Sequence, residues 1–198
     1  LAGSGATSVS KIPSIAANTT EVGRAADRLT QMFERRGFTV SRIATPGSPV
    51  LVARRDAATA ARGTLTFYMH YDGQPTDAKD WTIGHPFEPS AYLNRAKIDL
   101  AGASGPVNPD TRIYGRAAAD DKGPIIAFLA AMDGLLDAQA SLPWNLRAVL
   151  DGEEEAGSPN FTAAMTANAA AVRGDLAIIV DSPRHASGLP TVFYGSRG

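Results

Sequence analysis

Two acid-rich segments hold the residues of this chain that are best suited to chemistry. The first, residues 114–124, contains Asp120 and Asp121, and the second, residues 151–158, contains Asp151 followed by three consecutive glutamates. Carboxylates packed this densely repel one another unless a cation neutralises them, and the whole chain has a net charge of only -1. There is no cysteine, so the strong metal ligands are His, Asp and Glu. The pattern predicts a site for divalent metal ions.

The elements that must position these acids alternate between strands and helices. Apolar and β-branched runs predict strands over residues 38–43, 50–54, 64–69, 91–93, 145–150 and 176–180, and a further strand is expected at 191–194. This alternation predicts an α/β fold with a mixed, largely parallel sheet sandwiched by helices.

Three helices are expected between these strands. Asn18 and Glu21 form a capping-box start for a helix that runs to Gly37. Pro124 opens a second helix, because a proline in the first turn costs no bonded amide. Ser158 is expected to cap a third, Ala-rich helix.

The predicted topology brings the acids together. Ligands of open α/β sheets bind at the carboxyl ends of strands, and His70, residues 151–155 and Asp181 each follow a separate predicted strand. Seven of the twenty acids are therefore expected at one rim: Asp120, Asp121, Asp151, Glu153, Glu154, Glu155 and Asp181. Asp121 is expected to cap the helix at Pro124. A metal-bound His70 would give its other ring proton to a carboxylate such as Asp72.

Composition limits the partners. With 198 residues, 44% of them hydrophobic, the chain can bury one sizeable core. Nineteen basic and twenty acidic side chains leave no basic stripe, so neither nucleic acid nor a membrane surface is expected as a partner. No apolar run approaches membrane-spanning length. The compartment stays open between the cytoplasm and, after removal of a signal peptide, the periplasm or the exterior.

Five segments in a fixed order resemble the M20 family of zinc aminopeptidases, dipeptidases and aminoacylases, and within it the carnosinase-like dipeptidases. They are residues 69–75, Trp81 with residues 86–89, residues 114–124, residues 151–158, and Asp181. The resemblance implies two divalent ions, usually Zn²⁺ and sometimes Mn²⁺ or Co²⁺. It implies hydrolysis of the amide bonds of dipeptides or short peptides.

The resemblance also implies the metal ligands. His70 and Asp181 would bind one ion, Glu155 would bind the other, and Asp120 would bridge the two. It further implies a cis peptide between Asp120 and Asp121. Ala117 stands where the family usually has glycine, which predicts a negative φ at this position.

Two residues are expected to act beside the ligands. Asp72 would orient His70, and Glu154 would be the general base, which must stay free of the metal yet reach the attacking water. A shift of the motif by one residue would instead make Glu154 the ligand and Glu153 the base, which is the less favoured alignment.

The remaining histidines, His85 and His185, match no ligand position and are expected at the surface, with His185 nearer the pocket. Family members are about twice as long as this chain. Residues 1–198 are therefore expected to be the N-terminal portion of the catalytic domain. The lid or dimerisation domain, the C-terminal part of the catalytic domain and a closing histidine ligand would be absent.

The expected partners are a small peptide or N-acyl amino acid substrate and the missing C-terminal part of the same protein, with a homodimer at full length. The isolated chain is expected to show little or no activity. Two other functions stay open. One is an N-acyl amino acid deacylase of the same family. The other, of a different class, is a noncatalytic domain that binds Ca²⁺ or Mg²⁺, although those ions prefer all-oxygen sites and would leave His70 unexplained.

Overall fold

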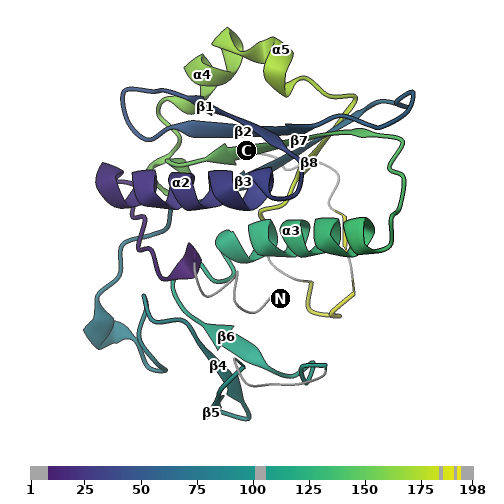
Figure 1. Cartoon of the computed structure of the whole chain (residues 1–198). Coiled ribbons are helices and arrows are strands. Elements are labelled where there is room, and N and C mark those ends of the chain that lie inside the picture. Colours follow the sequence, from purple (N-terminus) through teal and green to yellow (C-terminus); the bar gives the residue numbers. More distant parts are fainter. Residues whose placement is uncertain (1–8, 101–105, 183–184, 190, 193–198) are drawn as a thin grey trace.

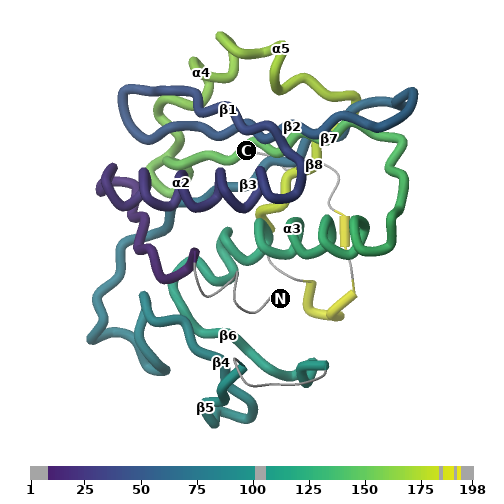
Figure 2. Tube along the Cα trace, viewed as in Figure 1, coloured from purple at the N-terminus to yellow at the C-terminus, as the bar shows by residue number. Residues whose placement is uncertain are grey.

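A five-stranded mixed sheet forms the centre of the computed structural model, which describes residues 9–100, 106–182, 185–189 and 191–192 (Figures 1 and 2). In spatial order its strands are β1 (Thr39–Ile43), β2 (Val50–Arg55), β7 (Asn145–Asp151), β3 (Thr64–His70) and β8 (Leu176–Ile179). β1, β2 and β7 pair antiparallel, whereas β7, β3 and β8 pair parallel. The predicted mixed sheet is confirmed. Its parallel part consists of β7, β3 and β8, and β3 ends at His70.

Helices cover both faces of this sheet. Figure 1 shows α2 (Thr19–Glu34) and α3 (Lys122–Asp137) on one face and the short helices α4 (Phe161–Ala167) and α5 (Ala169–Val172) on the other. The predicted α/β sandwich is thus confirmed.

Helix α2 forms because its apolar side chains recur at helical spacing. Its buried residues are Val22, Ala25, Ala26, Leu29, Met32 and Phe33. Asn18 caps its start, since the side-chain oxygen accepts the amide N–H of Glu21 at 3.2 Å. The Glu21 carboxylate pairs with Arg24 instead of returning to the cap, so the capping box is half formed.

Two kinds of contact join α2 to α3. Phe33 packs edge to face on Phe38 at 5.3 Å and stacks on Phe128 of α3 at 6.0 Å. Arg36, just beyond α2, donates from Nε to the Leu129 carbonyl at 3.2 Å and from Nη2 to Asp133 at 2.6 Å. The two helices therefore form one layer against the sheet.

A second, three-stranded antiparallel sheet occupies the stretch that was expected to be mostly loop. Its order is β5 (Ala96–Ile98), β4 (Ser90–Leu93), β6 (Arg112–Tyr114), and a 3₁₀ turn, η1 (Ala78–Asp80), precedes it. Only β4 was predicted. β6 leads directly into the turn before α3, so this small sheet sets where that turn begins (Figure 2).

The region after β7 also differs from expectation. A 3₁₀ turn, η2 (Glu154–Ala156), follows β7, and α4 begins only at Phe161. Ser158 is therefore not a helix cap, and its hydroxyl donates instead to Asp151 Oδ2 at 2.6 Å. Thr191 and Val192 are not in a strand, and the rest of the strand expected at 191–194 lies outside the described residues. No helix within the described ranges is long and apolar enough to cross a membrane.

Candidate metal centre

Four elements of the fold bring potential ligands to one place. His70 ends β3, Asp181 comes two residues after β8, Asp120 lies in the turn before α3, and Glu154 begins η2 after β7. One ligand atom each from His70, Asp120 and Asp181 lies within 4.8 Å of the others. His70 Nε2 is 2.8 Å from Asp120 Oδ1 and 3.9 Å from both Asp181 Oδ2 and Glu154 Oε2. The carboxyl ends of the parallel strands thus meet as the sequence predicted.

Asp72 contacts the ring nitrogen of His70 that lies away from Asp120. Both side chains are fully buried, and His70 Nδ1 lies 3.2 Å from Asp72 Oδ1. The same carboxylate accepts the amide N–H groups of Glu154 at 3.2 Å and Glu155 at 3.0 Å. Since a carboxylate can only accept, Nδ1 carries a proton and Nε2 is the nitrogen that faces the acids. Asp72 therefore fixes both the imidazole and the turn that carries the glutamates.

The electrostatics of His70 reflect this crowd of acids. Burial by itself lowers its pKa, but the hydrogen bonds to Asp72 and Asp120 and the charges of Asp72 and Asp121 outweigh burial and raise the pKa to about 10. The neighbouring carboxylates therefore favour a positive charge at this position.

The two glutamates of η2 have different surroundings. Burial, with the charges of Asp181 and Glu155, raises the pKa of Glu154, while His70 acts in the opposite direction. Glu155 lies outside the group around His70, and its Oε2 accepts a hydrogen bond from Gln74 Nε2 at 2.6 Å. Sequence reasoning did not assign Gln74 a role, and its place in the motif at residues 69–75 was the only indication that it lies near the site.

Asp121 does not cap α3, so that expectation was wrong. It occupies the N-cap position without a side-chain bond to the helix, because its Oδ2 turns to β3 and accepts the amide N–H of His70 at 3.0 Å. Burial raises its pKa to about 8, opposed by the hydrogen bond and charge of His70 and reinforced by Asp181 and Asp120. The peptide bond between Asp120 and Asp121 is cis, as the family resemblance implied.

Asp151 and Glu153 serve the architecture of the turn. Asp151 accepts from Ser158 and, at 3.0 Å, from the amide of Glu153. The Glu153 carboxylate accepts from the amide of Ser48 at 2.9 Å and from Asn160 Nδ2 at 2.8 Å. Of the seven acids expected at the rim, the structure places Asp120, Glu154 and Asp181 around the His70 imidazole. Asp121 binds the His70 backbone amide, and Asp151, Glu153 and Glu155 have partners elsewhere.

Ala117 corrects a further expectation, because its φ is +57°. The amide of Ala118 donates to Gly115 at 3.2 Å and the amide of Lys122 donates to Ala117 at 3.1 Å, which bends the chain tightly at this residue. Such a turn uses the left-handed conformation that glycine adopts most easily. Alanine adopts it here while 4% exposed.

The other histidines are exposed, as predicted. His85 Nδ1 accepts the amide of Phe87 at 3.3 Å, and His185 Nδ1 lies 2.7 Å from Ser187 Oγ. Trp81, part of the family motifs, lies under the Arg116 guanidinium at 5.7 Å from the ring centre. The early motifs therefore pack on the segment that leads to Asp120.

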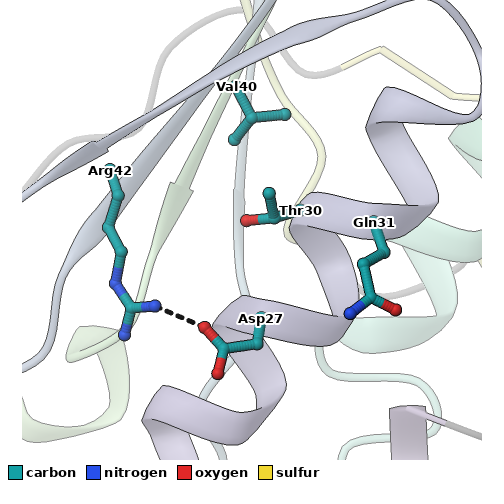
Figure 3. Close-up of a pocket in the computed structure, with 5 residues that line it drawn as sticks. All are labelled: Asp27, Thr30, Gln31, Val40 and Arg42. Carbon is teal, nitrogen blue, oxygen red and sulfur yellow. Dashed lines mark hydrogen bonds and ion pairs between the residues drawn. The ribbon is translucent and has the colours of Figure 1, made fainter.

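A surface hollow lies between α2 and β1, away from these motifs. Figure 3 shows its lining residues, which are Asp27, Thr30, Gln31, Val40 and Arg42. Asp27 Oδ1 and Arg42 Nη1 pair at 2.5 Å, but both side chains are largely exposed. An exposed ion pair of this kind contributes little to the stability of the fold. None of these residues belongs to the group around His70.

Known proteins resemble this chain in sequence. The chain is 28% identical over 155 residues to the human Beta-Ala-His dipeptidase, covering 77% of this chain and 27% of that protein. It is 28% identical over 152 residues to the Cys-Gly metallodipeptidase dug1 of Schizosaccharomyces pombe, covering 76% of this chain and 29% of that protein.

A solved structure has a similar fold. The M20 family metallo-carboxypeptidase Sso-CP2 from Sulfolobus solfataricus superposes with a TM-score of 0.74 and 30% identity, over 92% of this chain and 38% of that one. The chain thus spans less than two fifths of the length of these relatives. The sequence pattern of peptidase family M20/M25/M40 matches residues 66–192, which include every residue placed around His70. This chain therefore belongs to peptidase family M20/M25/M40.

Proposed function

We propose that the protein containing this chain is a metal-dependent hydrolase that cleaves the amide bond of dipeptides or short peptides. The observation that carries the proposal is the approach of ligand atoms of His70, Asp120 and Asp181 to within 4.8 Å of one another, beside the carboxyl ends of β3 and β8. The names of the dipeptidase relatives support the choice of substrate.

The residues fit divalent metal ions. One imidazole nitrogen and two carboxylates arrive from three separate elements, and His70 keeps its other nitrogen on Asp72, as metal-bound histidines usually do. We propose two ions, with Asp120 as the bridging ligand and Glu155 binding the second ion. A nitrogen ligand favours Zn²⁺, with Mn²⁺ or Co²⁺ as alternatives, over a noncatalytic Ca²⁺ or Mg²⁺ domain.

The chemistry divides between the metal centre and Glu154. Two bound ions would lower the pKa of a bound water and stabilise the oxyanion that forms from the amide carbonyl. Glu154 is the proposed general base, since its carboxylate lies 3.9 Å from His70 Nε2 and its surroundings raise its pKa. The alternative alignment, with Glu153 as the base, is not supported because Ser48 and Asn160 already bind the Glu153 carboxylate.

We further propose that the remainder of the protein supplies a lid domain, the rest of the catalytic domain and a closing histidine ligand, and that the whole protein is a homodimer. The short share of each relative that the chain covers supports this division. The surface of β8 supports it too, because Leu176 is 54% exposed and Ile179 is 68% exposed. The 198-residue chain alone is accordingly expected to turn over little substrate.

The test compares substrates on the full-length, zinc-loaded protein. A panel of dipeptides should be hydrolysed in preference to N-acetyl amino acids, and a chelator should abolish turnover. Preferential release of acetate would instead assign a deacylase, and no turnover of either class would reject the proposal. Glu154→Gln should lower kcat by about 100-fold or more without loss of bound zinc. Glu34→Gln, at an exposed position of α2, is the matched control and should leave kcat unchanged.

A further inference from the structure

The N-terminal segment, residues 9–15, is fastened to the first residue of α3. Lys122 is 1% exposed, and its ammonium donates to the Ile12 carbonyl at 2.6 Å and to the Val9 carbonyl at 3.3 Å. Val9 itself is fully buried. Lys122 therefore ties the N-terminal segment to the turn that carries Asp120.

The same segment is fastened to the end of β3. Ser14, also fully buried, donates its hydroxyl to the Tyr71 carbonyl at 2.9 Å, and its backbone carbonyl accepts the Gly73 amide at 3.1 Å. Ile15 continues the contact as an isolated parallel bridge to Gly73. Both neighbours of Asp72 in the chain are thus bonded to one buried serine.

The ammonium of Lys122 is buried, and its two hydrogen-bond partners are backbone carbonyls. A neutral donor could satisfy two carbonyls, whereas a buried ammonium is costly without an anion nearby. Burial lowers the pKa of Lys122 to about 8, and the charges of Asp72 and Glu21 oppose this shift. Asp72 is the fully buried acceptor that orients both His70 and the glutamate turn.

We propose that Lys122 is a positioning residue for the metal centre. Through residues 9–15, which bind Lys122 at one end and Tyr71 and Gly73 at the other, it holds the turn around Asp72 in register with the turn around Asp120. The inference rests on the proposed function only in taking His70 and Asp120 as metal ligands.

The test uses the full-length protein with Lys122→Met, Lys122→Arg and the control Lys79→Met, whose side chain is 76% exposed. Zinc affinity is measured by competition with a chelator, and amide hydrogen exchange is followed at Gly73 and Glu155. Lys122→Met should weaken zinc binding about 10- to 100-fold, the usual effect of disturbing residues behind a ligand. It should also speed exchange at Gly73 and Glu155 while leaving strand β2 protected. Lys122→Arg should recover part of the affinity, and Lys79→Met should match the wild type.

Unchanged zinc affinity and unchanged local exchange in Lys122→Met would overturn the proposal. So would faster exchange throughout the molecule with normal zinc affinity, which would mean that Lys122 only stabilises the fold. If Lys122→Met does not fold, Ser14→Ala removes the hydroxyl that holds Tyr71 and should give the same two effects in milder form. If the wild type binds no zinc, the proposed function fails, whereas local exchange in the variants still decides whether Lys122 positions the turn.

Discussion

Replacing Asp72 with asparagine changes one oxygen to an amino group at the most constrained carboxylate of the site. Asp72 Oδ1 faces His70 Nδ1 at 3.2 Å and the amide of Glu154 at 3.2 Å, and Oδ2 accepts the amide of Glu155 at 3.0 Å. An asparagine keeps a single acceptor oxygen, so in either orientation its amino group faces at least one N–H donor.

The size of the effect follows from this geometry. In the better orientation the asparagine keeps the bonds to His70 and Glu154 and leaves the amide of Glu155 without its acceptor, which costs about 1–3 kcal/mol of unfolding free energy. Loss of a carboxylate behind a metal-bound histidine weakens metal binding by about 10- to 100-fold. The pKa of His70 should also fall when the hydrogen bond and charge of Asp72 are lost, so weaker proton competition at pH 7 offsets part of the loss. We therefore expect the lower end of that range, about tenfold.

Two measurements on the full-length protein test this reasoning. Urea denaturation of the metal-free protein gives the stability change, and calorimetric titration with Zn²⁺ at pH 7 gives the affinity. Asp77→Asn, an exposed carboxylate paired with Lys79, is the control and should change neither quantity. An Asp72→Asn protein with wild-type stability and wild-type zinc affinity would refute the view that Asp72 fixes His70 and the glutamate turn.

Three further predictions concern other parts of the chain. Phe33→Ala removes a fully buried ring and should lower the free energy of unfolding by about 3–5 kcal/mol in urea denaturation; a loss below about 1 kcal/mol would contradict its place in the core. Gly152→Ala would place a Cβ atom 2.6 Å from Tyr71 Oη and should destabilise the protein by about 1–3 kcal/mol. The same Cβ would lie 2.7 Å from Tyr71 Cζ, and unchanged stability of Gly152→Ala in thermal unfolding would argue against the clash. Since His70 has a pKa raised to about 10 by its carboxylate partners despite burial, each zinc ion bound there should release a proton, and zinc affinity should rise about tenfold per pH unit from pH 7 to 9. An affinity independent of pH over this range would contradict the raised pKa of His70.

The central strands and the ends at which the site forms could be predicted because they depend on local pattern. Runs such as residues 64–69 and 145–150 are apolar enough to be buried strands, and parallel pairing then puts His70 and Asp151 side by side, as the register shows. Strands β5 and β6 could not be predicted, because each is three residues long with two of them exposed, and each exists only through pairing with β4.

The directions of the side chains within the acidic turns could not be predicted from the sequence. Asp120 and Asp121 are adjacent and identical, yet one meets the imidazole of His70 and the other its backbone amide. The positive φ of Ala117 depends on two turn hydrogen bonds that nothing in the local sequence requires. Ser14 gave no signal at all, because its role arises from a contact with Tyr71, far along the chain.

Strand β8 pairs with β3 along one side, and no described residue pairs along its other side. A row of free N–H and C=O groups next to exposed apolar side chains is a template for adding a strand from another molecule. Prepared by itself, the 198-residue chain should therefore self-associate as its concentration rises, with growing light scattering and a shift to larger species in gel filtration. Binding measurements on that chain are meaningful only at dilutions where it stays monomeric.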